Sequence, residues 1–456
     1  MLSQAIYTRR APVVNRKSKH ILIVGGGYVG LYTGLRLQRT LRRELREGTV
    51  RITLIDPRSY MTYQPFLPEA AAGNISPRHV VAPLRRVLPK IRILNGLVSK
   101  VHHEARTVTF EPAAGQSREI EYDIIVMAAG SISRTLPIPG LEDAAIGFKT
   151  VGEAIALRNR VIALLDRAET SDDEDVRRRA LTFVVVGGGF AGIEALAELE
   201  DMTEDAIKYY PSIEKKDLRW VLIEASDRIL PEVGPEMGKW TAEQLRERGI
   251  ELKLETFLQS CEGGLVKTSD GDEFESATIV WTAGVKPSPV VNSGDLPVDE
   301  RGRIKTTTRL TVAATKDAFA AGDVAGVPDM TNAGQYCAPN AQHAVRQSKV
   351  LGDNITAYLR GGQLKDYRHR YAGSVAGLGL YRGVANVYGV KLRGFPAWFM
   401  HRTYHLSRVP TVNRKVRVVA DWTLSLFFRR ETVSLGEIEH PRDDFRAAAA
   451  TMPKKK

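Results

Sequence analysis

Two glycine-rich segments constrain the fold of this chain more than any other feature. Each follows a short apolar run and precedes a helical stretch, and their spacing is Gly-x-Gly-x-x-Gly. The glycines are Gly25, Gly27 and Gly30 in the first segment, and Gly187, Gly189 and Gly192 in the second. This pattern gives a tight turn, a close approach of backbone to pyrophosphate and close helix–strand packing. The helix N-terminus then offers N–H groups to phosphates. We therefore expect an α/β chain with two Rossmann-like dinucleotide-binding domains.

An acidic residue ends the next strand in each unit. Asp56 ends the apolar run 51–56, and Glu224 ends the run 219–224. A carboxylate at this place accepts hydrogen bonds from a ribose diol and repels a 2′-phosphate, so Glu224 favours NADH over NADPH. Arg228 lies close in sequence and softens that preference. The segment between Gly30 and Asp56 exceeds the usual spacing of about 20 residues, which predicts an elongated helix over 29–45.

Three further apolar runs are expected to form strands that end beside a nucleotide. Strands are expected at 123–130 and 278–284, and a third run ends in Gly-Asp before an Asn/Gln-rich helix. Their terminal residues are Ala129 with Gly130, Ala283 with Gly284, and Gly322 with Asp323. Asp323 suits contacts to the ribityl and phosphate groups of a flavin. Residues 262–274 are expected to form a hairpin, because they contain Gly-Gly and Asp-Gly turns.

The cysteines and the hydropathy exclude several classes of protein. Cys261 and Cys337 are the two cysteines and form no CxxC pattern, so we expect neither a disulfide framework nor a thiolate metal site. No metal is expected. No secretory signal is visible, and no stretch of about 18 apolar residues is long enough to span a bilayer.

The positive charge is concentrated at two places. The formal net charge is +12, with five cations and no acid in residues 1–20, and eight cations and one acid in residues 393–430. Nucleic-acid binding or an anionic membrane surface would both explain such patches. In the second region, apolar and aromatic residues lie at helical spacing beside the cations: Phe395, Trp398, Phe399 and Arg402, then Val412, Val416, Val419, Trp422 and Phe427 with Arg414, Lys415 and Arg417. This pattern favours interfacial membrane helices over a dimer or core helix pair, and a dimer through the same region is compatible with it.

Together these motifs resemble the pyridine nucleotide–disulfide reductase superfamily, and within it the type II NADH dehydrogenases. The resemblance extends from His20 to about Leu435. Besides the glycine motifs, four stretches support it: 60–85, 279–289, 337–355 and 395–430. It implies FAD in the first domain and NADH in an inserted one. The implied domains are 1–150 and 286–390 for FAD, 151–285 for NADH, and 391–456 for membrane association.

The resemblance also assigns roles to individual residues. Gln64 and Ala341 are expected beside the flavin. Gln342 is expected to line a quinone pocket and donate to a quinone carbonyl, the alternative being a helix-surface glutamine; Gln347 is a weaker candidate. Glu194 is expected near nicotinamide and flavin in proton handling, unless it merely complements the helix dipole. Asn340 stands where the family often has Thr, which makes the pocket geometry differ in detail.

The reductases that use an internal disulfide need a CxxxxC pair on the flavin face, and residues 61–69 (MTYQPFLPE) hold no cysteine. The electrons therefore leave the flavin for another acceptor. We expect an NADH:quinone oxidoreductase that pumps no protons, with menaquinone or ubiquinone as acceptor. It would be a peripheral homodimer on the cytoplasmic face of the cell membrane, without a nucleic-acid partner. One alternative is a soluble FAD-dependent NAD(P)H reductase that feeds ferredoxin. The other is a flavin-containing sensor or nucleic-acid scaffold, which the two ribose acids disfavour.

Overall fold

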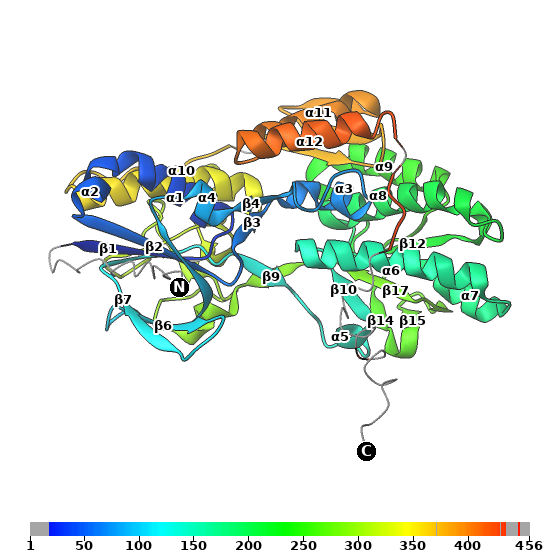
Figure 1. Cartoon of the computed structure of the whole chain (residues 1–456), viewed down its shortest axis with the longest axis horizontal. Helices are drawn as coiled ribbons and strands as arrows, with labels where there is room; N and C mark the ends of the chain where they lie inside the picture. The colour runs from blue at the N-terminus through cyan, green and yellow to red at the C-terminus, as the bar shows by residue number, and fades with distance from the viewer. Residues whose placement is uncertain (1–17, 371, 429, 435–445, 447–456) are drawn as a thin grey trace, which may run out of the picture. The chain divides into compact units, whose positions relative to one another are not determined.

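The computed structural model describes residues 18–370, 372–428, 430–434 and 446 (Figure 1). Contacts divide the chain into two compact units, each made of three segments. Unit 1 is Met1–Met61, Pro83–Ser131 and Pro287–Arg370, and unit 2 is Thr62–Ala82, Ile132–Lys286 and Tyr371–Lys456. The basic residues 1–17 of the sequence lie outside the described part. The domain boundaries expected from the sequence stay predictions, because compactness alone does not say which cofactor a segment binds.

Unit 1 is built on a seven-stranded sheet in the order β20-β8-β1-β2-β5-β6-β7. Its strands are β1 (Lys19–Val24), β2 (Val50–Asp56), β5 (Arg92–His102), β6 (Thr107–Pro112), β7 (Arg118–Glu121), β8 (Ile124–Met127) and β20 (Ala318–Ala320). The five strands from β20 to β5 are parallel, while β6 and β7 extend the sheet as an antiparallel meander. The central strands are nearly continuous apolar runs, as expected for a parallel sheet buried on both faces.

Helices α1 (Tyr28–Thr40) and α10 (Ala341–Leu359) pack side by side on this sheet (Figure 1). Arg36 on α1 donates two hydrogen bonds to Asp353 on α10, at 2.6 and 2.9 Å. The single long helix expected over 29–45 is wrong. The chain leaves helical geometry at Leu41, and α2 (Arg42–Glu47) follows and ends at Gly48, whose φ is 72°.

Unit 2 contains a five-stranded parallel sheet in the order β10-β17-β11-β12-β13. The strands are β10 (Ala145–Gly147), β11 (Thr182–Val186), β12 (Arg219–Ile223), β13 (Glu251–Lys253) and β17 (Thr278–Trp281). Helices α6 (Val151–Thr170), α8 (Phe190–Ala206) and α9 (Pro235–Glu247) belong to the same unit. The expected strand–turn–helix–strand plan is confirmed. The expected hairpin is also present, as β15 (Leu265–Thr268) and β16 (Glu273–Glu275), with β14 (Leu258–Ser260) added at its edge.

The last described part of unit 2 begins with an antiparallel meander of β22 (Gly373–Gly377), β23 (Gly383–Val387) and β24 (Val390–Arg393). Two helices follow, α11 (Phe395–Arg408) and α12 (Val412–Leu424), and short helix α3 (Leu67–Ala71) belongs to the same unit. Among the described residues, no helix is long and apolar enough to cross a membrane.

The capping box of α6 gives a direct test of local stability. The Thr150 side chain accepts from the Glu153 N–H, and the Glu153 carboxylate accepts from the Thr150 N–H at 2.7 Å. We expect Thr150→Ala to lower the free energy of unfolding by about 1 kcal/mol in urea titrations. Thr170→Ala at the exposed end of the same helix is the control and should change it by less than about 0.5 kcal/mol. Equal effects of the two substitutions would contradict the capping role.

Candidate active site

The first glycine turn lies in unit 1, between β1 and α1. A Cβ on Gly25 would lie 2.4 Å from the carbonyl oxygen of Ala128, and one on Gly30 would lie 1.8 Å from that of Gly25. Both positions therefore require glycine. A Cβ on Gly27 would meet nothing within 4 Å, and Gly27 is the N-cap of α1 without a side-chain cap. The open side of Gly27 and the N–H groups at the start of α1 thus fit a pyrophosphate.

Asp56 is held by this turn. The Gly26 N–H donates to Oδ2 at 2.6 Å, and the Arg58 N–H donates to Oδ1 at 2.7 Å. Burial raises the pKa of Asp56, while these two hydrogen bonds lower it. A carboxylate oxygen accepts more than one hydrogen bond, so both oxygens retain capacity for ribose hydroxyls.

The second turn, in unit 2, repeats the arrangement. A Cβ on Gly192 would lie 1.9 Å from the carbonyl oxygen of Gly187, while one on Gly189 would meet nothing within 4 Å. The Glu224 carboxylate accepts from the Gly188 N–H at 2.5 Å and from the Ser226 N–H at 2.7 Å. In each turn the residue between the first two motif glycines, Gly26 or Gly188, thus donates a hydrogen bond to the acid at the end of the next strand, an arrangement that fits a dinucleotide. We call this arrangement the glycine–acid clamp.

The other expected strand-end residues of unit 1 follow neighbouring strands. Ala129 and Gly130 come after β8, and Gly322 and Asp323 come after β20, so both pairs lie at the same sheet edge as the first turn. Gly130 has φ 66° and Gly322 has φ 75°. Asp323 accepts a hydrogen bond from the Ser131 hydroxyl at 2.7 Å. This edge, at the carboxyl ends of parallel strands, is the usual ligand side of such a sheet. In unit 2, Ala283 and Gly284 follow β17 at the corresponding edge, with φ 85° at Gly284.

Gln342 and Gln347 both lie on α10 but have different surroundings. The helix begins at Ala341, with the Asn340 side chain as its cap. Gln347 is buried, and its amide oxygen accepts from the Gly322 N–H at 2.7 Å. The Gln342 Oε1 lies 3.0 Å from Nε2 of His369. Burial lowers the pKa of His369 to about 4, so this ring is neutral near pH 7 and its Nε2–H donates to Gln342.

Glu194 and Gln64 lie in unit 2. Glu194 is on the first turns of α8, where it is 8% exposed, so it is no surface carboxylate. Its Oε1 accepts from the Gly377 N–H at 2.9 Å and lies 3.0 Å from Nε2 of His401. The side chain of Gln64 donates to the carbonyl oxygen of Lys149 at 3.1 Å.

The two cysteines are buried free thiols. Burial raises the pKa of Cys337 to about 11, and burial also raises the pKa of Cys261. Neither is a thiolate near neutral pH, so neither is activated as a nucleophile.

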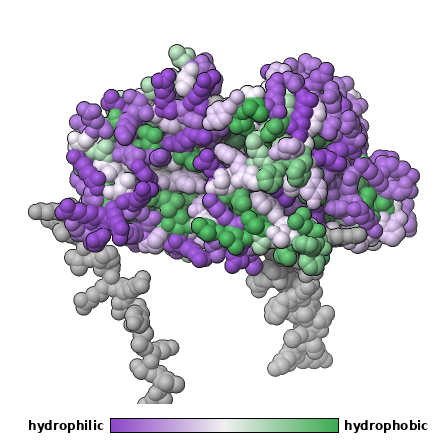
Figure 2. All heavy atoms as spheres, turned by 90° about the horizontal axis from the view of Figure 1, so that it is seen from above, coloured by the Kyte–Doolittle hydropathy of each residue, from purple (hydrophilic) through white to green (hydrophobic). Residues whose placement is uncertain are grey.

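The C-terminal helices expose valines and phenylalanines but not their tryptophans. On α12, Val412 and Val416 are 76% and 62% exposed, and hydrophobic side chains gather on the face that carries these helices (Figure 2). The expectation that the tryptophans belong to the exposed face is wrong. Trp398 is buried, and the rings of Trp398 and Trp422 lie against the buried guanidinium of Arg402, with centroids 4.3 and 4.9 Å away.

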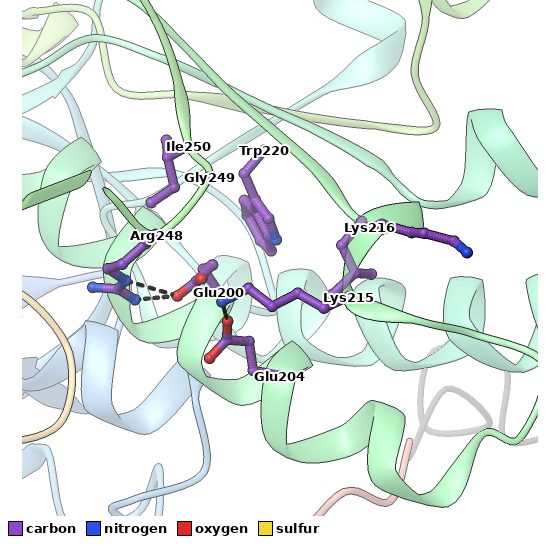
Figure 3. A pocket seen from close by; sticks show the side chains of 9 residues that line it. Glu200, Glu204, Lys215, Lys216, Trp220, Arg248, Gly249 and Ile250 are labelled. Carbon is purple, nitrogen blue, oxygen red and sulfur yellow. Dashed lines mark hydrogen bonds and ion pairs between the residues drawn. The ribbon is translucent and has the colours of Figure 1, made fainter. Parts of the chain in front are cut away.

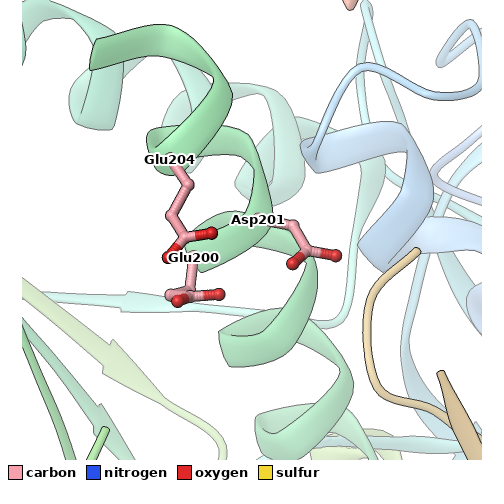
Figure 4. A group of neighbouring side chains, drawn as sticks. All are labelled: Glu200, Asp201 and Glu204. Carbon is pink, nitrogen blue, oxygen red and sulfur yellow. The ribbon is translucent and has the colours of Figure 1, made fainter. Parts of the chain in front are cut away.

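A separate pocket on unit 2 contains both acids and bases (Figure 3). Trp220 lines it beside Glu200, Glu204, Lys215 and Arg248. The neighbouring carboxylates of Glu200, Asp201 and Glu204 lie close enough together to bind a cation (Figure 4).

However, these three carboxylates already have cationic partners. Arg248 forms ion pairs with Glu200 and Asp201, and Lys215 forms one with Glu204. The acids are therefore balanced by protein side chains, and we assign no metal to them.

Comparison with known proteins agrees with this geometry. The profile of the pyridine nucleotide-disulphide oxidoreductase family matches residues 19–348. The chain is 31% identical to a type II NADH:quinone oxidoreductase of Staphylococcus haemolyticus, covering 84% of this chain and 93% of the relative. It is 27% identical to a type II NADH:quinone oxidoreductase of Mycobacterium tuberculosis, covering 92% and 91%. Its fold matches that of NDH2 from Plasmodium falciparum in complex with NADH, with a TM-score of 0.84, 16% identity, and coverage of 92% and 100%.

The chain therefore belongs to the pyridine nucleotide-disulphide oxidoreductase family and, within it, to the type II NADH:quinone oxidoreductases. The cofactors of that family are FAD and NADH, and the two clamps fit them. The expected fold class is confirmed for its α/β part.

Sequence reasoning missed the histidines beside the predicted site residues. His369 contacts Gln342 from a segment 27 residues later, and His401 contacts Glu194 from a segment far away in sequence. The available signal for His401 was its spacing of four residues from His405 on an otherwise apolar and basic helix, which placed both rings on one helix face.

Substitutions at Gly27 and Gly189 can test nucleotide binding without disturbing the fold, because no protein atom lies close to either glycine on its side-chain side. A valine at position 27 or 189 would meet no protein atom at its Cβ, yet it would fill the space that a pyrophosphate needs. We expect Gly27→Val to purify without FAD. Gly189→Val should retain FAD, with KM for NADH raised about tenfold or more. Flavin spectra and steady-state kinetics measure both effects, and unchanged FAD content and KM would contradict the assignment. Gly192→Ala is the contrasting variant and should misfold, because its Cβ would overlap the Gly187 oxygen.

Proposed function

We propose that this protein oxidises NADH through bound FAD and passes two electrons to a membrane quinone. The observation that carries the proposal is the pair of glycine–acid clamps, one in each unit. Membership of the type II NADH:quinone oxidoreductases supports the same activity. The sequence also lacks a cysteine pair in the flavin-side loop, so an internal disulfide is not the acceptor.

In this proposal FAD occupies the site of unit 1, and NADH the site of unit 2. When bound, FAD accepts a hydride from NADH and gives two electrons to the quinone. The residues of the chain bind and orient the nucleotides. Asp56 and Glu224 hold the ribose hydroxyls, and the N-termini of α1 and α8 face the phosphates. Asp323, fixed by Ser131, and Gln64 complete the flavin contacts.

Quinone reduction is assigned to the start of α10. The neutral His369 ring donates to the Gln342 carbonyl oxygen and fixes the orientation of the amide. We propose that Gln342 lies beside the quinone carbonyl. Because the Gln347 amide binds the Gly322 N–H, we assign Gln347 to holding the Gly-Asp loop. Glu194 handles a proton in the same reaction.

The acceptor side is proposed to lie on a membrane. The exposed apolar residues of α11 and α12, together with the cations beside them, fit an anionic lipid surface. A quinone dissolves in lipid, so an enzyme that reduces it gains from peripheral attachment there. We place the protein on the cytoplasmic face of the cell membrane, as a homodimer with its apolar helices available to lipid.

Steady-state NADH oxidation with menaquinone and ubiquinone analogues tests the activity. We expect turnover with a quinone, much slower turnover with NADPH, and none with ferredoxin. Turnover with ferredoxin alone would favour a soluble reductase. If the protein does not oxidise NADH, the proposed function is wrong.

Glu224 sets the choice of nicotinamide cofactor. Its carboxylate accepts from two backbone N–H groups, and in this proposal it also accepts hydrogen bonds from the ribose diol of NADH. We expect Glu224→Ala to lower kcat/KM for NADH by roughly 10- to 100-fold, because a hydrogen bond to a charged group is lost. The ratio of NADH to NADPH activity should fall with it. An unchanged ratio would mean that another residue sets the specificity.

Membrane attachment is tested by removing apolar side chains that are already exposed. We expect the triple variant Val412→Ser, Val416→Ser and Val419→Ser to fold normally and bind vesicles of phosphatidylcholine and phosphatidylglycerol at least about tenfold more weakly. The matched control exchanges three other exposed apolar residues, Leu97, Tyr209 and Phe257, for Ser and should bind as the wild type. Equal vesicle binding by both variants would contradict the assignment. A change only in oligomeric state, measured by light scattering, would assign the helices to a dimer.

A further inference from the structure

A group of exposed cations lies on unit 1, at the end of its sheet opposite to the glycine turn. The turn follows the last residue of β1, whereas the cations lie on the last turn of α1, on α2 and at the starts of β2 and β5 (Figure 1). We call this group the basic edge. Its members, all exposed, are Arg39, Arg42, Arg46, Arg51, Lys90 and Arg92.

Contacts within unit 1 bring the segments of the basic edge together. The side chain of Gln38 on α1 donates to the Val87 carbonyl oxygen at 3.4 Å, and its own amide oxygen accepts from the Lys90 N–H at 2.9 Å. In the parallel sheet, Thr53 of β2 stands beside Arg92 of β5. The last turn of α1 and the starts of two neighbouring strands therefore form one surface.

A buried histidine beside this surface responds to its charge. The pKa of His20 is lowered to about 4, by burial first and then by the charge of Arg51, and Arg92 acts in the same direction. The Glu121 carbonyl oxygen and Asp123 oppose this shift. Two cations of the basic edge thus act on one buried group, which places them close together.

The acids at this end of the sheet are already paired with cations outside the group. Among the residues that the structure describes, the six cations of the basic edge form no ion pair, so their charges are not compensated. Glu121 is exposed and its carbonyl oxygen contacts His20, so its carboxylate offsets at most one of the six charges. The paired acids and their partners are Glu44 with Arg360, Glu47 with Arg43, and Asp123 with Lys19.

The sequence before β1 does not supply the missing negative charge. Residues 1–17 lie outside the described part, and they contain Arg9, Arg10, Arg16 and Lys17 but no acid. They join the chain at the start of β1, at this same end of the sheet. The balancing anions must therefore come from outside the chain or from the solvent.

The residue types of the basic edge indicate the class of its partner. Five of the six cations are arginines, whose guanidinium groups bind phosphate oxygens through two parallel hydrogen bonds. Protein interfaces usually have apolar or aromatic anchors at their centre. In the described segments 18–61 and 83–96, which hold the basic edge, no large apolar side chain is exposed. A layer of phosphate groups fits this surface better than a protein partner does.

We propose that the basic edge is a second membrane contact, which binds the phosphate groups of anionic lipids by charge alone. This inference rests on the proposed function, because a membrane quinone as acceptor brings the enzyme to a layer of lipid phosphates. The contact differs in kind from that of α11 and α12, which uses exposed apolar side chains. Since the two contacts belong to different units, each is tested by its own substitutions.

The test variant combines Arg39→Gln, Arg42→Gln and Arg46→Gln in the full-length protein. Glutamine has a helix propensity close to that of arginine, so α1 and α2 should keep their structure. Binding is measured to vesicles of phosphatidylcholine alone and of phosphatidylcholine mixed with phosphatidylglycerol. At low salt we expect the variant to bind the mixed vesicles roughly 100-fold more weakly than wild type. Binding to phosphatidylcholine alone should stay unchanged, and the difference on mixed vesicles should largely disappear at about 1 M salt.

The matched control removes the same number of charges from other exposed positions of unit 1. It combines Lys100→Gln, Arg301→Gln and Lys305→Gln and should bind mixed vesicles nearly as tightly as wild type. Equal losses in the two triple variants would mean that net charge alone matters, and would overturn the role of the basic edge. NADH oxidation with a soluble ubiquinone analogue should be the same in all variants, which shows that the nucleotide sites are intact.

The remaining outcomes separate this inference from the proposed function. Wild-type protein that binds neither kind of vesicle would overturn the proposed membrane attachment and this inference together. Wild-type protein and the test variant that bind mixed vesicles equally well would overturn the role of the basic edge alone. A test variant that binds vesicles as wild type but has lost affinity for RNA would assign the surface to a nucleic acid, and the proposal would again be wrong.

Discussion

A hydrogen bond from the residue between the first two motif glycines to the acid of the next strand is the contact on which both proposed nucleotide sites depend. It joins Gly26 to Asp56 and Gly188 to Glu224. It holds Asp56 and Glu224 beside their turns, at the sheet edges where α1 and α8 begin. The last glycine of each motif lets the helix pack closely on the same turn, because a Cβ on Gly30 or Gly192 would overlap a backbone oxygen.

Much of this arrangement was predictable because it is local. A turn, its helix and the next strand lie within about 40 residues of one another, and steric rules fix their order. The close contacts of Gly25 and Gly30 in unit 1 agree with the tight turn and close packing predicted for them, and the role of Gly27 at a pyrophosphate stays a prediction. The break at Leu41 was missed, since α1 and α2 together preserve the helical pattern of residue types and only the backbone shows where one helix ends.

The contacts that tune the site were harder to predict because they join distant segments. His401 is more than 200 residues from Glu194, and His369 reaches Gln342 from a loop without regular structure. The tryptophans illustrate the same limit. Residue type and helical spacing suggested that Trp398 faces outward. Its ring is instead buried against the guanidinium of Arg402, which pairs with Glu69, and forms a cation–π contact with it. Five apolar side chains of the same helices are exposed instead: Phe395 and Phe399 on α11, and Val412, Val416 and Val419 on α12.

The central claim is that electrons pass from NADH to a quinone by way of the flavin, and an anaerobic titration tests it most directly. The account predicts that one equivalent of NADH per chain bleaches the visible flavin absorbance, and that one equivalent of a ubiquinone analogue restores it. NADPH should bleach it far more slowly, because of Glu224. A flavin that NADH bleaches but quinone cannot restore, while ferredoxin can, would contradict the account.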